Sequence, residues 1–546
     1  SIRVGSVIVP FVLFIFAVVV CVVYEFRGIP MMAPDILTVQ TATSVMGNYT
    51  FKLTFEQYSV ILVCMAFFFT FLRLHEVKVI EKRVFHIAGF IVVALGCGLF
   101  TNQIILSDFM EEHQINIRMF RPMESYQKYG GVLTFARSVG YAVVKKPEGY
   151  TTAKVDQIIQ ENEKKSANEQ QSTAKQYPNI ITVVNETFAD IKVLGDFKTN
   201  EDYMPYFHSL KKNCVTGYTY ASIVGGQTAN TEFELLTGNT LGFLSAGTTA
   251  FQLYIHGQMP SLVSNLKAEG YSGNKAMHPF NPYNYNRPAV YKDFGFADFI
   301  DKFDFPKNVK RVREYISDEA NVDRIISEYE KNRKKTDQPF YMYNMTIQNH
   351  SPYDKDAANF KQPIKIESSK YDAEANRYLN LIKYSDDSLK QLTSYFEKCK
   401  EPTIILFLGD HQPRLTDEFM NKITNGQYQT WSGEQMMKRY QVPFVIWANY
   451  DIKEQHIEKT SMNYIQSILT QTAGVKMTGY QRFLNEVRKE VPTITSQGYW
   501  GKNGKFYQIN DKGSPYYGII QKYRMIQYNM MFDKKNRRDS FFEVSK

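Results

Sequence analysis

Three apolar runs in the first 107 residues constrain this chain more than any other feature, because such runs need a bilayer or a protein core around them. They cover 4–24, 58–72 and about 84–106 of a chain of 546 residues. The first is unbroken and close to the roughly 20 residues that cross a bilayer. A buried core helix is the alternative for the second, which is the shortest. We therefore predict a transmembrane region, residues 1–107, with three helices.

Basic residues set the orientation of these helices. Arg73, Lys78, Lys82 and Arg83 crowd the loop between the second and third runs, and basic loops stay in the cytoplasm. Everything after about residue 107 is then extracytoplasmic. A secretory signal peptide explains only the first run and is rejected. Because the chain begins with Ser and not Met, we expect the natural chain to begin earlier.

Residues 108–178 connect the membrane region to the rest of the chain. Aliphatic and aromatic residues are mixed with three basic ones over 131–146, which favours a helix lying on the outer leaflet, with an ordinary packed helix as the alternative. The stretch 160–178 is rich in Glu, Lys, Gln and Ser and is typical of a linker. We expect one large extracytoplasmic domain, with a C-terminal extension, over 179–546.

The charge and the cysteines narrow the class of partner without deciding it. A net charge of +9 and a pI near 8.9 suit an anionic partner, and we favour a membrane surface because no zinc-finger or RNA-binding signature accompanies the charge. Nucleic acid is not expected. Cys214 and Cys399 are the cysteines outside the apolar runs. They are either bridged or free and buried, and no disulfide framework is predicted.

Three short apolar runs in the large domain end in polar residues. They cover 180–184, 340–347 and 403–408, and helical stretches such as 371–398 lie between them. Strands this apolar are usually buried on both faces, which predicts an α/β fold with a parallel sheet. Ligands bind beyond the carboxyl ends of such strands. The residues expected together at that edge are Glu186, His350, Asp410 and His411.

Two carboxylates with an imidazole form a set that suits Mn²⁺ or Zn²⁺. For Asp410 and His411 the alternative is a capping aspartate beside a bystander histidine. A fourth element, 225–236, has two glycines, a hydroxyl residue and a helix-forming run, and so predicts a turn that leads into a helix. Thr228 at that turn is either a helix cap or a nucleophile whose oxygen also binds the metal.

Together these segments resemble one family, the lipoteichoic acid synthases of the alkaline-phosphatase and sulfatase-like superfamily. One motif would be weak, whereas five in the right order are specific. The resemblance implies a mixed, mostly parallel sheet flanked by helices behind a transmembrane region. The motifs are Asn185-Glu186-Thr187, the run from Gly225 to Phe233, His278 followed nine residues later by Arg287, the run from Gln348 to Tyr353, and Gly409-Asp410-His411.

The resemblance also implies roles for individual residues. The catalytic nucleophile is Thr228. One Mn²⁺, with Mg²⁺ or Zn²⁺ as alternatives, is held by Glu186, Thr228, Asp410 and His411. Substrate phosphate and glycerol meet His278, Tyr285, Arg287 and His350. The sequence departs from the family in two ways: Tyr285 stands where a Trp is frequent, and three membrane helices are visible where five are usual.

The implied function is a phosphoglycerol transferase of the bacterial cell membrane, multi-pass, with its catalytic domain outside. It moves glycerol phosphate from phosphatidylglycerol, by way of a covalent Thr intermediate, onto a glycolipid or a growing poly(glycerol phosphate) chain of lipoteichoic acid, and so serves the cell wall. The first alternative is another sulfatase-fold phosphotransferase or hydrolase, such as a phosphoethanolamine transferase. The second is a non-catalytic relative that binds teichoic acid. A sulfatase is disfavoured because the residues around Thr228 lack the Cys/Ser-x-Pro-x-Arg pattern.

Overall fold

The computed structural model divides the chain into two compact units. The N-terminal unit is 1–144 with 246–248, and the C-terminal unit is 145–245 with 249–546. Each is described by itself. The residues that the structure describes are 11–21, 30–33, 58–59, 61–63, 65–66, 69–70, 83–107, 109–113, 115, 122–142, 144–166, 176–245, 248–367 and 373–544.

The N-terminal unit contains one helix that is long and apolar enough to cross a bilayer, among its described residues. This stretch, Ile87–Ile105, has a mean hydropathy of 1.8 and none of it is buried. It lies in α4 (Arg83–Phe100) and the π-helical turn that follows, Thr101–Leu106. A shorter apolar helix covers Phe11–Cys21. The pieces of 58–72 that are described are helical, and the remainder of that predicted span, with 4–10 and 22–24 of the first, lies outside the described residues.

Short helices follow α4 in the same unit. They are α5 (Phe109–Glu112), α6 (Pro122–Tyr129) and α7 (Gly131–Ala142). Helix α7 exposes Val132 and Val139 while Arg137 is buried, and the Arg137 guanidinium donates to the carbonyl of Ile105 over 2.9 Å. An interfacial position for this helix stays a prediction.

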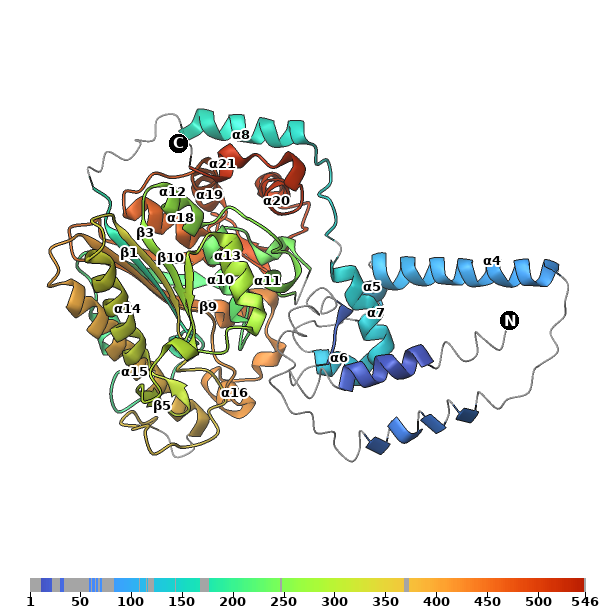
Figure 1. Cartoon of the computed structure of the whole chain (residues 1–546), viewed down its shortest axis with the longest axis horizontal. Helices are drawn as coiled ribbons and strands as arrows, with labels where there is room; N and C mark the ends of the chain where they lie inside the picture. The colour runs from blue at the N-terminus through green and yellow to red at the C-terminus, as the bar shows by residue number, and fades with distance from the viewer. Residues whose placement is uncertain are drawn as a thin grey trace. The chain divides into compact units, whose positions relative to one another are not determined.

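A mixed, mostly parallel sheet of eight strands forms the centre of the C-terminal unit (Figure 1), in the order β10-β2-β9-β8-β1-β7-β3-β4. This confirms the predicted α/β class. Strand β9 pairs antiparallel with β2 and with β8, and the remaining pairings are parallel. The strands are β1 (Asn179–Asn185), β2 (Cys214–Tyr220), β3 (Ser272–Met277), β4 (Asp298–Ile300), β7 (Phe340–Met345), β8 (Thr403–Gly409), β9 (Gln441–Ala448) and β10 (Gln455–Ser461).

Strands β8, β1 and β7, which the sequence analysis singled out, are neighbours at the middle of this sheet. Every residue of the three is buried, as expected for strands covered on both faces. Ile181 and Val183 of β1 belong to one large apolar cluster with residues of α14 and α15. Helices α10 and α18 pack together on the opposite side of the sheet (Figure 1).

The helices of this unit have the following bounds: α8 (Thr152–Ser166), α9 (Pro205–Ser209), α10 (Thr228–Thr237), α11 (Ala250–Leu253), α12 (Leu262–Ala268), α13 (Arg287–Phe294), α14 (Asp318–Arg333), α15 (Ala373–Phe396), α16 (Asp417–Ile423), α17 (Gly433–Met436), α18 (Met462–Thr472), α19 (Gly479–Glu490), α20 (Tyr517–Met531) and α21 (Asp539–Phe542). Two small sheets join them. One pairs β5 (Arg311–Val312) with β6 (Tyr315–Ile316), and the other contains β11 (Thr493–Thr495), β12 (Gly498–Trp500) and β13 (Phe506–Tyr507).

Helix α8 extends into the stretch predicted as linker. Val155, Ile158 and Asn162 are buried, and this spacing of three and four residues places them on one helix face. The Asn162 side chain donates to the carbonyl of Gly479. The composition of 160–166 resembles that of a linker only because the other face of α8 is solvated. Cys214 and Cys399 are both free thiols.

Candidate active site

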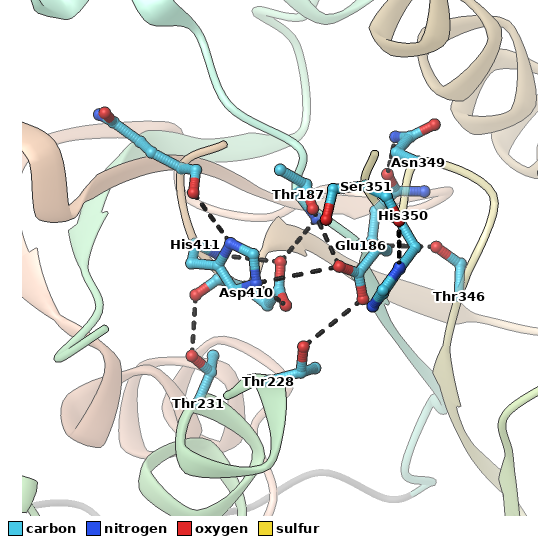
Figure 2. A network of polar contacts seen from close by, with 12 residues as sticks. Glu186, Thr187, Thr228, Thr231, Thr346, Asn349, His350, Ser351, Asp410 and His411 are labelled. Atoms are coloured by element: carbon cyan, nitrogen blue, oxygen red, sulfur yellow. Dashed lines mark hydrogen bonds and ion pairs between the residues drawn. The ribbon is translucent and has the colours of Figure 1, made fainter. Parts of the chain in front are cut away.

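Glu186, Asp410 and His411 converge where β1 and β8 end (Figure 2), and their nearest ligand atoms all lie within 4.8 Å of one another. The parallel pairing of β1 with β8 brings Asn185 level with Gly409. The residue after each strand is therefore delivered to the same point. All three side chains are buried.

The histidine of this cluster has a defined tautomer. Nδ1 of His411 lies 2.9 Å from the carbonyl oxygen of Gln412, so Nδ1 carries the proton and donates it. In the neutral ring Nε2 then has the lone pair, and it lies 3.2 Å from Asp410 Oδ2 and 3.8 Å from Glu186 Oε1. Neither Nε2 nor Asp410 Oδ2 has a hydrogen-bond partner. Three electron-pair donors facing one another in a buried place fit a divalent cation.

The charges of the cluster also favour a bound divalent cation. Burial, and after it the negative charge of Asp410, raise the pKa of Glu186 to about 8. Two buried carboxylates this close repel each other, and a cation between them removes the repulsion. The donor set of two carboxylates and one imidazole therefore fits a metal on chemical grounds.

Neighbouring groups hold the two carboxylates in place. The backbone N–H groups of Thr187 and His411 donate to Asp410 Oδ1 over 2.7 and 2.8 Å. The Thr187 hydroxyl donates to Glu186 Oε1 over 2.9 Å, and the Thr231 hydroxyl donates to the carbonyl of Asp410. These bonds leave Asp410 Oδ2 directed toward the cluster.

Thr228 is the first residue of α10, and its hydroxyl donates to Glu186 Oε2 over 3.5 Å. Figure 2 shows it beside the cluster. The preceding residue, Gln227, has a left-handed backbone with φ of 65°. Such a conformation costs of order 1–3 kcal/mol in a residue other than glycine and is concentrated at functional sites. The helix cap reading of Thr228 is therefore wrong: Gln227 occupies the N-cap position and Thr228 the one after it.

A narrow cleft, of about 70 Å³, lies above the cluster. It is lined by Glu186, Thr228 and His411 together with the predicted substrate residues His278, Tyr285, Arg287 and His350. Asp410 lies beneath this surface with no exposure. The structure therefore brings all the predicted site residues to one place, although their roles stay proposals.

The Arg287 guanidinium is buried and already bonded to protein groups, so it is not an exposed fork with all its donors available to a substrate. Its Nε and Nη2 both donate to Glu232 Oε1, over 3.0 and 2.7 Å, and both side chains are buried. Tyr291 and Tyr343 donate to the other Glu232 oxygen, Tyr343 over 3.1 Å. One edge of the guanidinium is thus used by Glu232, and Nη1 donates to the carbonyl of Asn284 over a longer 3.5 Å. Arg287 lines the cleft, where the Tyr285 ring lies 5.1 Å from its guanidinium carbon.

The two cleft histidines are neutral. Nδ1 of His278 lies 3.0 Å from the carbonyl of Met345 and Nδ1 of His350 lies 2.7 Å from that of Ser351. Burial, and then the positive charge of Arg287, hold the pKa of His278 well below its usual range, and burial lowers the pKa of His350. With Nδ1 as the donor, Nε2 is the nitrogen of each neutral ring that can accept a hydrogen bond.

Several residues that matter here were missed by reasoning from the sequence. Glu232 is the most important, and a signal existed: Thr228, Thr231 and Glu232 follow the spacing of one helix face, i, i+3 and i+4. Phe280 and Arg414 also line the cleft. For these two the sequence contains no signal, because their position depends on how the loops fold.

A family model described as Sulfatase matches residues 178–475. A putative cyclic beta-1,2-glucan modification protein of Rhizobium meliloti is 30% identical over 433 residues, which cover 78% of this chain and 65% of the relative. A lipoteichoic acid synthase of Staphylococcus saprophyticus is 23% identical over 66% of this chain and 55% of its own length. The chain therefore spans less than two thirds of these relatives.

Among solved structures, the phosphoglycerol transferase GacH of Streptococcus pyogenes, in complex with sn-glycerol-1-phosphate, is similar in fold. The TM-score is 0.60 at 20% identity, over 74% of this chain and 100% of that one. The lipoteichoic acid synthase LtaP of Listeria monocytogenes gives a TM-score of 0.50 over 70% of this chain and 98% of that one, at 19% identity. The predicted sulfatase-like fold is thereby confirmed.

Proposed function

Because this chain belongs to the sulfatase family, we propose that it is a metal-dependent phosphotransferase in which Thr228 is the nucleophile. The reaction is transfer of glycerol phosphate from phosphatidylglycerol to an acceptor hydroxyl. The observation that supports it most is the contact of Thr228 Oγ1 with Glu186, 3.5 Å away, beside two orphaned ligand atoms in a buried cluster. A hydroxyl at a cation site is the arrangement that phosphoryl transfer needs.

Glu186, Asp410 and His411, with the Thr228 oxygen, would hold one Mn²⁺, for which Mg²⁺ and Zn²⁺ are the alternatives. A bound cation supplies charge neutralisation at the phosphoryl oxygens and lowers the pKa of a coordinated hydroxyl. Glu186 orients the Thr228 hydroxyl through its hydrogen bond, and the N-terminus of α10 adds a positive dipole end at the same place.

The proposed reaction has two displacement steps. Thr228 Oγ1 forms a bond to phosphorus while the bond to the diacylglycerol oxygen breaks, which leaves a glycerophospho-threonine. An acceptor hydroxyl then forms the new bond to phosphorus and releases Thr228. Arg287, which lines the cleft, meets a phosphoryl oxygen. Nε2 of neutral His278 or His350 accepts a proton or a hydrogen bond from a glycerol or acceptor hydroxyl.

The acceptor is the least constrained part of the proposal. The resemblance in motifs favours a glycolipid or a growing poly(glycerol phosphate) chain. A glucan is the second candidate, because the relative named for cyclic beta-1,2-glucan modification has a higher identity and a wider coverage of this chain than the named synthase. Both acceptors offer a hydroxyl to the same phosphoryl centre.

We further propose a multi-pass anchor in a bacterial cytoplasmic membrane, with the C-terminal unit outside. The apolar helix Ile87–Ile105 supports one span, and the other two rest on the sequence. An anchor suits this chemistry because both the donor lipid and the released diacylglycerol stay in the bilayer.

The test is to incubate the full chain with Mn²⁺ and phosphatidylglycerol labelled in its headgroup. We expect diacylglycerol, together with labelled product in the arm that holds the true acceptor, either glycolipid or cyclic glucan. Turnover of phosphatidylethanolamine in place of phosphatidylglycerol would identify a phosphoethanolamine transferase. Binding of teichoic acid with no diacylglycerol from either lipid would contradict an enzyme and favour the non-catalytic relative.

We expect Arg287→Lys to lower turnover by about 10²-fold while the bound metal is unchanged. A lysine keeps the charge, but it cannot contact Glu232 and present a second donor to the cleft, and small misplacements of a binding group have effects of this size. Rates and metal content measured on the same preparation check this. Wild-type kinetics in the variant would remove Arg287 from the site.

A further inference from the structure

Two large apolar side chains are exposed in the described part of the C-terminal unit, Tyr283 at 46% and Phe303 at 72%. Isolated exposed apolar residues are common on protein surfaces. What distinguishes this pair is its position: Tyr283 lies on a segment that lines the active-site cleft, and Phe303 lies on a turn whose backbone is hydrogen-bonded to that segment. We call the pair the aromatic rim.

The chain connects both members of the rim to the cleft. Tyr283 directly precedes Asn284 and Tyr285, which line the cleft. On the other segment, the backbone N–H of Lys302 donates to the carbonyl of Phe280 over 3.4 Å, and Phe280 also lines the cleft. The Phe280 ring stacks on His350, with ring centroids 6.1 Å apart. Phe280 thus connects the segment of Phe303 to His350, a proposed substrate residue.

Basic side chains accompany the rim. Nζ of Lys302 lies 5.0 Å from the centroid of the Phe303 ring and 6.0 Å from that of Phe280. Lys307 is exposed, and within the described part of the chain it forms no ion pair. The two carboxylates of this turn accept hydrogen bonds from backbone N–H groups of the same turn. Asp301 accepts from the N–H of Phe303, and Asp304 accepts from the N–H of Asp301.

Residues 301–311 contain four basic and two acidic side chains. Lys310 forms an ion pair with Glu319, which leaves three basic side chains against two acidic ones in the segment. Exposed aromatic rings beside lysines form the combination found where proteins meet the headgroup region of a bilayer, since the ring enters the apolar boundary while the ammonium stays with the anionic phosphates. Phenylalanine, which has no polar atom, suits that boundary better than it suits open solvent.

We propose that the aromatic rim docks on an anionic bilayer, so that a phospholipid headgroup enters the cleft directly from the membrane surface. The role of this docking in supplying the donor rests on the proposed function, in which the donor is a membrane lipid. The contact between the rim and the bilayer does not depend on that function. The rim would hold the cleft at the headgroup level, while Lys302 and Lys307 select a surface with negative charge.

The test places a fluorophore at the tip of the rim in the full chain. Phe303→Trp is reconstituted in vesicles of phosphatidylglycerol and phosphatidylcholine, whose acyl chains are either brominated or not. The matched control is Lys398→Trp, since Lys398 is exposed and lies just before β8 begins, at the sheet edge opposite the cleft. The wild type corrects for the three native tryptophans.

We expect brominated lipid to lower the emission added by Trp at 303 by about half or more, and to leave that at 398 unchanged. Pure phosphatidylcholine should weaken the effect. Equal emission of the 303 variant in brominated and unbrominated vesicles would overturn the proposal. Quenching or a spectral shift with soluble glucan alone, and not with lipid, would instead assign the rim to a glycan.

A second variant separates docking from catalysis. Phe303→Ser removes an exposed ring and leaves the fold intact, and we expect its KM for phosphatidylglycerol in vesicles to rise several-fold, while its rate on a short-chain, water-soluble analogue is unchanged. An equal loss on both donors would contradict docking. Bromine quenching does not depend on turnover, so a chain that docks but transfers nothing would sink the proposed function alone.

Discussion

Thr228→Ala is expected to abolish release of diacylglycerol, with a fall in rate of at least about 10³-fold, because it removes the hydroxyl that we propose forms the covalent intermediate. The protein should stay folded. Thr228 is the first residue of α10, and the one hydrogen bond of its hydroxyl is the 3.5 Å contact with Glu186. Alanine is a good helix former, so the free energy of unfolding should change by less than about 2 kcal/mol.

The wild type supplies the complementary measurement. A brief reaction with phosphatidylglycerol and no acceptor should add the mass of a glycerophosphoryl group to the peptide that contains Thr228. Thr237→Ala is the matched control, because Thr237 lies at the other end of the same helix and its hydroxyl donates to the carbonyl of Phe233, away from the cluster. That variant should retain the adduct. Full turnover by Thr228→Ala would exclude a covalent threonine, whatever metal is bound.

Asp410→Asn should remove the metal and the activity without unfolding the protein. The asparagine oxygen can accept the two backbone bonds, from Thr187 and His411, that Asp410 Oδ1 accepts now. Its amide nitrogen can donate to His411 Nε2, which lies 3.2 Å from the oxygen it replaces. We expect metal affinity to fall by more than about 10²-fold, the upper end of the loss when a group behind a ligand is changed.

Thermal unfolding with and without metal checks this prediction. In the wild type a free metal concentration 100 times Kd should stabilise the fold by about 2.7 kcal/mol, and in Asp410→Asn the same metal should have almost no effect. Without metal the variant should be at least as stable as the wild type, since one of two repelling carboxylates is gone. Elemental analysis should give one cation per wild-type chain. Two would indicate a hydrolase of the alkaline-phosphatase type.

The three central strands were predictable because their signal is local. Runs such as Ile180–Val184 are apolar except for one threonine and end in polar residues, and burial on both faces of a parallel sheet selects for that pattern. Their adjacency could be expected as well, since polar groups such as Glu186 and Asp410 need each other to hold a cation. The predicted cluster needed no knowledge of the loops.

Arg287 shows where this reasoning ends. The sequence indicates a guanidinium near the substrate, yet the direction of its donors depends on Glu232, which lies on a different element 55 residues away. The end of helix α8, which was assigned to a linker, could not be predicted for another reason. Only three of the helix's described side chains, those of Val155, Ile158 and Asn162, are buried. Polar side chains therefore dominate the composition of 160–166, and the composition does not reveal the helix.

The distance along the chain between the two halves of the cluster has a consequence for biogenesis. Thr187 and Asp410, joined by a hydrogen bond, are 223 residues apart, and β8, which directly precedes Asp410, lies between β1 and β9. At a synthesis rate of about 5–20 residues per second, Glu186 leaves the ribosome roughly 10 to 45 s before its partners. The proposed cation would therefore have no complete set of ligands until β8 is made. One edge of β1 can pair with β7 earlier, but the edge that receives β8 stays open until then. Metal binding would in that case follow the assembly of the central strands and not guide it.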